Sequence, residues 1–88
     1  MKTQFKSSFL KAIKKIDDNQ LKTVIENTIL NVESADNIKQ IINLKKLKGH
    51  NKFYRIRIGN YRIGIKIEEE TVFFVDFDHR KNIYRIFP

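Results

Sequence analysis

Apolar residues recur every three to four positions in the first half of the chain. They form one stripe over residues 7–16 and a second over 21–33, which predicts two amphipathic helices. Ser7 or Ser8 is the expected cap of the first helix. The acidic stretch 17–19 is expected to end that helix and to cap the next one. We expect the two helices to form a hairpin with both stripes on a common core.

The period of the pattern changes from 3.6 to 2 after Gly49. Before this glycine, Ser34 is expected to cap a short helical piece that carries Ile38, Ile41 and Ile42. After it, apolar and polar residues alternate, which predicts strands. The predicted strands are Phe53–Ile58, Tyr61–Ile67, Val72–Asp78 and a short Ile83–Phe87, with a further edge strand over Lys2–Phe5.

This order of elements predicts an α+β fold. We expect an antiparallel sheet of three to four strands with the N-terminal helical hairpin packed on one face. Neither a linker nor an internal repeat divides the 88 residues, so residues 1–88 are expected to form a single domain.

The turn Gly59–Asn60 suits a two-residue hairpin and fixes the pairing of its strands. The register puts Arg57 opposite Arg62 on one face, while isoleucines and tyrosines point from the other face toward the helices. Arg55 and Gly64 form the next pair beside the arginines. Like charges directly opposite each other destabilise a sheet by up to about 1 kcal/mol. A glycine within a strand often marks the close approach of a ligand or another backbone. A sheet face that carries both a like-charge pair and a glycine within a strand favours an anion-binding role.

The following turn decides the faces of the third strand. We expect a three-residue loop, Glu68–Glu70, because a two-residue loop would turn Asp76 and Asp78 into the core. The longer loop places Asp76 opposite Arg62. The same alternation brings Arg80 close to the arginines. The core residues expected from this strand are Phe73, Val75 and Phe77, with Phe53 and Phe74 exposed.

The charge of the chain favours a polyanionic partner. Its net charge is +8, from 18 basic and 10 acidic residues, and all five arginines lie after residue 54. Arginine makes forked contacts with phosphate, whereas the lysines also fit a solvated surface. The candidate phosphate site is Arg55, Arg57, Arg62 and Arg80. The candidate contacts with an RNA backbone are Lys45, Lys46, Lys48, Lys52 and Lys66.

Other site classes find little support in the sequence. The chain has no cysteine, which excludes disulfides and thiolate zinc sites. It has neither an apolar run of about 20 residues nor the apolar segment of a signal peptide, so we expect a cytoplasmic protein without membrane contact. Asp76 and Asp78 lie among arginines and are expected to pair with Arg62 or Arg80 rather than to hold a cation. No metal or cofactor is expected.

Two side chains near the C-terminus are candidates for proton transfer. Tyr84 offers a hydroxyl for acid–base chemistry and a ring that stacks on a base; the alternative is packing at the edge of the sheet. His79 is the other candidate, because histidine is the residue type most often used for acid–base chemistry near neutral pH. Its alternative is a strand-end residue that is hydrogen-bonded to the backbone.

Three segments together resemble the RelE/ParE superfamily of toxins from type II toxin–antitoxin systems. They are Leu47–Gly49, Tyr54–Ile63 and Asp78–Tyr84, and the two preceding helices fit as well. The resemblance implies an endoribonuclease that cleaves mRNA in the ribosomal A site without a metal. In this reaction the 2′-hydroxyl attacks the adjacent phosphate and leaves a 2′,3′-cyclic phosphate. The resemblance also implies a cognate acidic antitoxin, through which the complex contacts DNA.

The resemblance assigns roles residue by residue. It makes Arg55 and Arg57 the basic pair, which is lysine in the best-known RelE branch. Because arginine is a poor general base, proton transfer would fall to Tyr84 or His79, or be replaced by electrostatic activation. The superfamily also contains ParE-like inhibitors of DNA gyrase that are not enzymes, and an inactive RNA-binding module of the same fold is a third possibility. The remaining residues that match the RelE pattern are Arg62, Arg80 and Tyr84.

Overall fold

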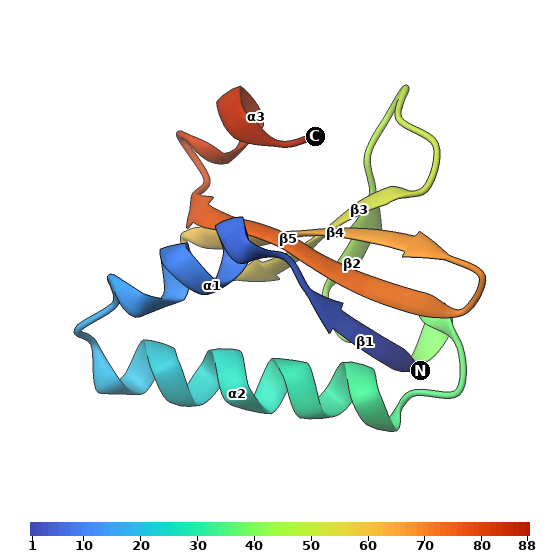
Figure 1. Ribbon diagram of the computed structural model, residues 1–88, viewed down its shortest axis with the longest axis horizontal. Helices are drawn as coiled ribbons and strands as arrows, with labels where there is room; N and C mark the ends of the chain where they lie inside the picture. The colour runs from blue at the N-terminus through green and yellow to red at the C-terminus, as the bar shows by residue number, and fades with distance from the viewer.

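The computed structural model describes residues 1–88 and contains one five-stranded sheet in the order β1-β5-β4-β3-β2. Figure 1 shows α2 on one side of this sheet and α3 on the other. No helix is long and apolar enough to cross a membrane. The elements are β1 (Lys2–Phe5), α1 (Ser7–Lys14), α2 (Asn19–Ser34), a 3₁₀ turn (Ile38–Gln40), β2 (Leu44–Lys46), β3 (Phe53–Ile58), β4 (Tyr61–Glu68), β5 (Thr71–His79) and α3 (Ile83–Ile86).

The predicted α+β class and helical hairpin are confirmed, with two differences in the sheet. The sheet has more strands than expected, because Leu44–Lys46 adds β2 beside β3 and the edge strand β1 pairs in parallel with β5. The predicted strand over Ile83–Phe87 is wrong. This segment forms the short helix α3, with Ile83 and Phe87 buried against the rest of the molecule.

Two of the predicted helix caps are wrong. The serines lie inside α1 rather than ahead of it, and the Ser8 hydroxyl donates to the carbonyl oxygen of Val75. Ser34 is the last residue of α2, and Asn37 caps the 3₁₀ turn instead. The cap of α2 is confirmed, since the Asp18 carboxylate accepts from the backbone N–H groups of residues 20 and 21 at 2.9 and 3.2 Å.

The core lies between the helical hairpin and one face of the sheet. Phe9 of α1 packs on Phe74 of β5, with ring centroids 5.3 Å apart, and α2 adds Ile25 and Val32. Burying such side chains contributes about 1.5–3 kcal/mol each. The sheet residues buried in this core are Ile56, Ile58, Ile63, Ile65, Val72, Phe74 and Phe77.

The register of the β3–β4 hairpin is the predicted one. Ile58 pairs with Tyr61, and Arg57 with Arg62. Gly59 has a φ of 56° at the first turn position, a backbone conformation that glycine adopts without strain. The apolar face and the arginine face of β3 and β4 are therefore those that the sequence predicts.

The predicted three-residue loop between β4 and β5 is wrong, because the strands are joined by a two-residue turn and a β-bulge follows farther along β5. The turn has only two residues, Glu69 and Glu70, with φ angles of 49° and 66°. Ile65 pairs with Phe74 but Gly64 pairs with Asp76, so Val75 is an extra residue in β5. This insertion reverses the alternation after Phe74. The two-residue turn and the bulge together correct four predictions for β5. Phe74 is buried, Phe73 and Val75 lie outside the core, and Asp78 rather than Asp76 stands opposite Arg62.

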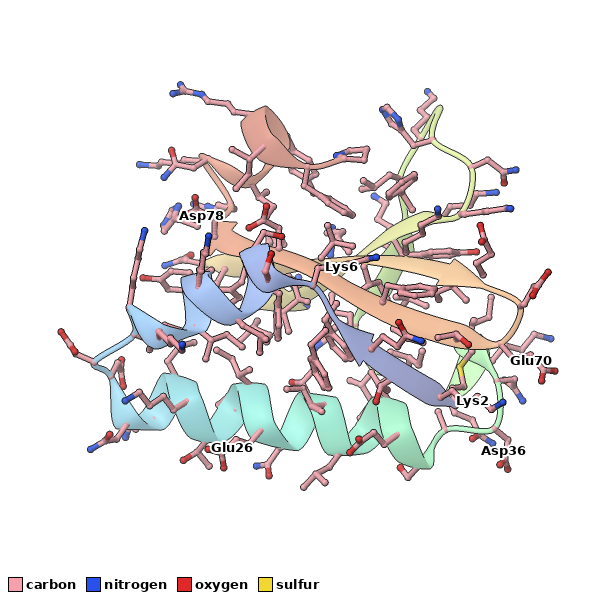
Figure 2. The ribbon with its side chains drawn as sticks, in the orientation of Figure 1. Lys2, Lys6, Glu26, Asp36, Glu70 and Asp78 are labelled. Carbon is pink, nitrogen blue, oxygen red and sulfur yellow. The ribbon has the colours of Figure 1, made fainter.

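The two aspartates of β5 bind backbone rather than arginine. Asp76 accepts from the N–H of Phe77 at 3.0 Å, and Asp78 from the N–H of His79 at 2.7 Å. Strand β1 pairs with β5 only as far as Phe74. The two carboxylates therefore accept from N–H groups of β5 that lie beyond the end of β1. Figure 2 shows Asp78 at the end of β5. The predicted pairing of the aspartates with Arg62 or Arg80 is wrong.

We predict that Asp76→Asn raises the melting temperature at neutral pH. Burial, supported by the nearby Asp78 carboxylate, raises the pKa of Asp76, although the hydrogen bond from Phe77 opposes this. The folded protein therefore holds the Asp76 proton more tightly than the unfolded chain. Stability falls as pH rises from the ordinary pKa through the raised one. The amide removes this loss and still accepts from Phe77.

Thermal unfolding between acidic and neutral pH measures the effect, with Asp36→Asn as a control at an exposed carboxylate. The gain at position 76 should shrink as the pH falls into the range where the wild-type carboxyl is protonated. A lower melting temperature for Asp76→Asn at neutral pH would contradict this account.

Candidate functional site

The sheet face opposite the helical hairpin carries the candidate arginines. Arg57 of β3 stands directly across from Arg62 of β4, and Arg55 follows on the same face. Arg80 lies in the turn after β5, where its backbone N–H donates to the carbonyl oxygen of Asn60 at 2.8 Å. This bond ties the turn to the β3–β4 hairpin. We call Arg55, Arg57, Arg62 and Arg80 the arginine cluster.

Arg62 lies within electrostatic reach of the other members of the cluster. Partial burial lowers the pKa of its guanidinium below the ordinary value. The charge of Arg55 lowers this pKa further, and so do those of Arg57 and Arg80, whereas Tyr84 raises it. The structure thus brings together four cations and one phenol that are spread over 30 positions of the chain, from residue 55 to residue 84.

The cluster has no carboxylate partner. The chain's two ion pairs both use Glu68, whose carboxylate lies 3.0 Å from Lys52 Nζ and 3.5 Å from Lys66 Nζ. The Arg62 guanidinium instead donates to the carbonyl oxygens of Gly59 and Tyr61 at 2.8 and 2.9 Å. These two bonds to backbone at the β3–β4 hairpin hold the side chain in place and leave its charge uncompensated. Such an arrangement suits an anion with several oxygens.

Helix α3 covers part of the same face. A Cβ at Gly64 would come within 2.6 Å of the Phe87 ring, so this ring rests directly on the backbone of β4. Phe87 also meets Phe53 edge-on, with ring centroids 5.6 Å apart. The close approach that the sequence indicates at Gly64 is made by the chain's own Phe87 ring.

Tyr84 lies on α3 with 54% of its surface exposed. It borders a hollow whose other side is formed by Lys48 and His50 in the turn between β2 and β3. His50 was not among the candidates from the sequence, because a single histidine in a loop gives no signal of its neighbours. The Tyr84 side chain is thus accessible from solvent.

His79 lies on the other side of the sheet. It pairs across the strands with Tyr61 and meets the Tyr61 ring edge-on, with centroids 5.4 Å apart. Its Nδ1 accepts from the backbone N–H of Lys81 at 3.2 Å. This is the hydrogen-bonded, strand-end position that the sequence left open as the alternative to a catalytic role.

The five candidate lysines are dispersed. Lys45 pairs with Arg55 and extends the cationic face, whereas Lys46, one residue on, belongs to the opposite face. Lys48 borders the hollow beside Tyr84. The other two, Lys52 and Lys66, are the partners of Glu68. No three His, Cys, Asp or Glu side chains gather as a possible metal site.

Comparisons with known proteins agree on one superfamily. The family described as the ParE toxin of the type II toxin–antitoxin system parDE matches residues 3–84. Toxin RelE3 of Methanocaldococcus jannaschii is 40% identical over 91 residues and covers the full length of both chains.

Solved structures agree with the sequence matches. The RelB–RelE antitoxin–toxin complex from Methanococcus jannaschii contains a chain with a TM-score of 0.80 and 34% identity, covering 96% of this chain and 98% of that one. The intact E. coli RelBE complex matches with a TM-score of 0.64 at 21% identity, over 89% and 94% of the two chains, and shows the shared fold.

We predict that Arg57→Thr stabilises the protein, by a few tenths to about 1 kcal/mol at low ionic strength. The substitution removes one of two like charges that stand directly opposite each other, Arg57 and Arg62. Added salt or inorganic phosphate should reduce the gain, because either one screens the same repulsion in the wild type.

Chemical denaturation at low and high ionic strength measures this difference. Lys2→Thr is the matched control, because it makes a similar change on an exposed strand where the facing residue is the neutral Thr71. An equal gain at both positions, or a gain at Arg57 that salt leaves unchanged, would show that repulsion within the cluster is not its cause.

Proposed function

The chain belongs to the RelE/ParE superfamily of toxins from type II toxin–antitoxin systems, and we propose that it is an endoribonuclease that cleaves mRNA in the ribosomal A site. It is a RelE-like toxin by its relatives. The observation that supports cleavage is the convergence of four unpaired arginines and one exposed tyrosine on a single face. These groups can bind a phosphate and act on the hydroxyl beside it.

The reaction we propose is attack by a 2′-hydroxyl on the adjacent phosphorus. The P–O bond to the 5′-oxygen breaks, and a 2′,3′-cyclic phosphate and a 5′-hydroxyl result. Negative charge grows on the phosphate oxygens and on the leaving oxygen, where fixed cations stabilise the transition state. Arg62 is already held by its bonds to Gly59 and Tyr61, so it need not reorganise during the reaction.

Tyr84 is the proposed proton-transfer group. An arginine stays protonated at any physiological pH and is a poor base. His79 lies on the opposite face of the sheet, beside Tyr61. Tyr84 is exposed and lies on α3, which covers part of the arginine face (Figure 1). No metal or cofactor takes part in the proposed reaction.

The proposed partners follow from the charge and from the relatives. The related RelE chains are found in complexes with RelB antitoxins. A cognate acidic antitoxin that covers the arginine face would suit a protein with a net charge of +8. The ribosome and its mRNA are the proposed target in the cytoplasm. DNA is reached only through the antitoxin complex.

A second candidate function is inhibition of DNA gyrase without catalysis. It is favoured by the match to the ParE family and by arginines in place of the lysine pair. Both functions use a cationic face, so binding to nucleic acid would not separate them.

We predict that expression without an antitoxin stops translation before it stops replication. Pulse labelling of protein and DNA synthesis, together with mapping of mRNA ends, measures the order of events.

Arg62→Ala should lower single-turnover cleavage on ribosomes by roughly 10²–10³-fold, the scale of losing one preorganised donor. Lys45→Ala should change mainly the salt dependence of binding. If DNA synthesis fails first while mRNA stays intact, the gyrase function is the correct one.

We predict that Tyr84→Phe lowers single-turnover cleavage by about 10²-fold or more, with little change in binding. The substitution keeps the ring and removes only the hydroxyl. His79→Gln should have a small effect, because His79 lies away from the cluster. A near-wild-type Tyr84→Phe beside an inactive His79→Gln would reverse the assignment.

A further inference from the structure

Helix α3 is held in place by few contacts. It has four residues, which are too few to form a stable helix without tertiary support. Two of them, Tyr84 and Ile86, are more than half exposed. Only Ile83 and the following Phe87 are fully buried. The position of the helix therefore depends on these two side chains.

Phe87 occupies a special place on the cationic face. Its ring rests on Gly64, which faces Arg55 across the strands and lies two residues from Arg62 on the same face. Any residue other than glycine at position 64 would meet the ring, because its Cβ would come within 2.6 Å of Phe87. The Phe53 ring packs edge-on against the Phe87 ring from a second side. Phe87 is thus an apolar anchor among the arginines, and its ring fits there only because Gly64 has no side chain.

The anchor is coupled to Tyr84 by the geometry of one helical turn. The N–H of Phe87 donates to the carbonyl oxygen of Ile83 at 2.9 Å. Tyr84 precedes Phe87, the residue that caps the C-terminus of α3, by only three positions. Both side chains also border the same hollow. A displacement of the Phe87 ring therefore moves the phenol relative to Arg62.

We infer that Phe87, seated on Gly64, is a positioning residue that fixes α3, and with it Tyr84, on the arginine face of the sheet. Its effect on cleavage rests on the proposed function, whereas its effect on α3 does not. Gly64 then contributes to the site indirectly, because it leaves room for the Phe87 ring, which in turn positions Tyr84.

The kinetic test uses Phe87→Ala, with Ile86→Ala as the matched control on the same helix. Phe87→Ala should lower kcat on ribosomes by about 10²-fold, the scale of a misplaced catalytic group, and leave KM nearly unchanged. Phe87→Leu should recover part of the loss. In the Tyr84→Phe background, Phe87→Ala should cost little more, because the residue acts through the hydroxyl. Full additivity of the two losses, or an equal loss in Ile86→Ala, would overturn the inference.

Amide hydrogen exchange tests the anchor without any activity. Phe87→Ala should speed exchange at Arg85 and at residue 87 at least about 10-fold, while the strand amides keep their protection. Gly64→Ala should do the same from the sheet side, since it expels the ring. Unchanged protection in α3 would overturn the inference. If the wild-type protein does not cleave mRNA, the proposed function fails and the exchange data still decide whether Phe87 anchors α3.

Discussion

The pairing of β3 with β4 through the Gly59–Asn60 turn determines the two faces of the molecule. Because strand side chains alternate, a single register sends the isoleucines to the helices and the arginines to the opposite face. A shift of one residue would bury Arg57 and Arg62 and expose the core. The core thus fixes the register of the arginines. The burial of Ile56 and Ile63 stabilises the strand pairing that places Arg57 opposite Arg62, although these like charges repel each other.

The distribution of acidic residues keeps that repulsion in place. The structure has carboxylates near enough to be considered as partners, since Asp78 stands opposite Arg62. Its oxygen nevertheless accepts from the N–H of His79, and Glu68 binds two lysines farther along the sheet. The arginines therefore have no carboxylate to compensate their charge. Part of the chain's stability is exchanged for a surface that favours an anion.

The sequence predicts the features that depend on local chemistry. Gly59 marks a tight turn, Asp18 marks a helix start, and the arginine face follows from strand alternation. It does not predict the Glu69–Glu70 turn, because this turn would bury Asp76 and Asp78 if β5 were regular, and the bulge at Val75 that keeps them out of the core leaves no signal in the sequence. For α3, the pattern of 83–87 indicates a strand, but the segment forms a short helix that is followed by Phe87, whose ring packs on the distant Gly64.

The aspartates of β5 also bear on how copies of this chain meet one another. An exposed strand edge offers free N–H groups to any extended segment, and it is a common starting point for intermolecular aggregation. In β5 the carboxylates of Asp76 and Asp78 already occupy the donors of Phe77 and His79. A strand from another molecule would have to displace an internal acceptor and approach two negative charges. The same two residues that leave the arginines unpaired therefore protect the sheet from uncontrolled self-association.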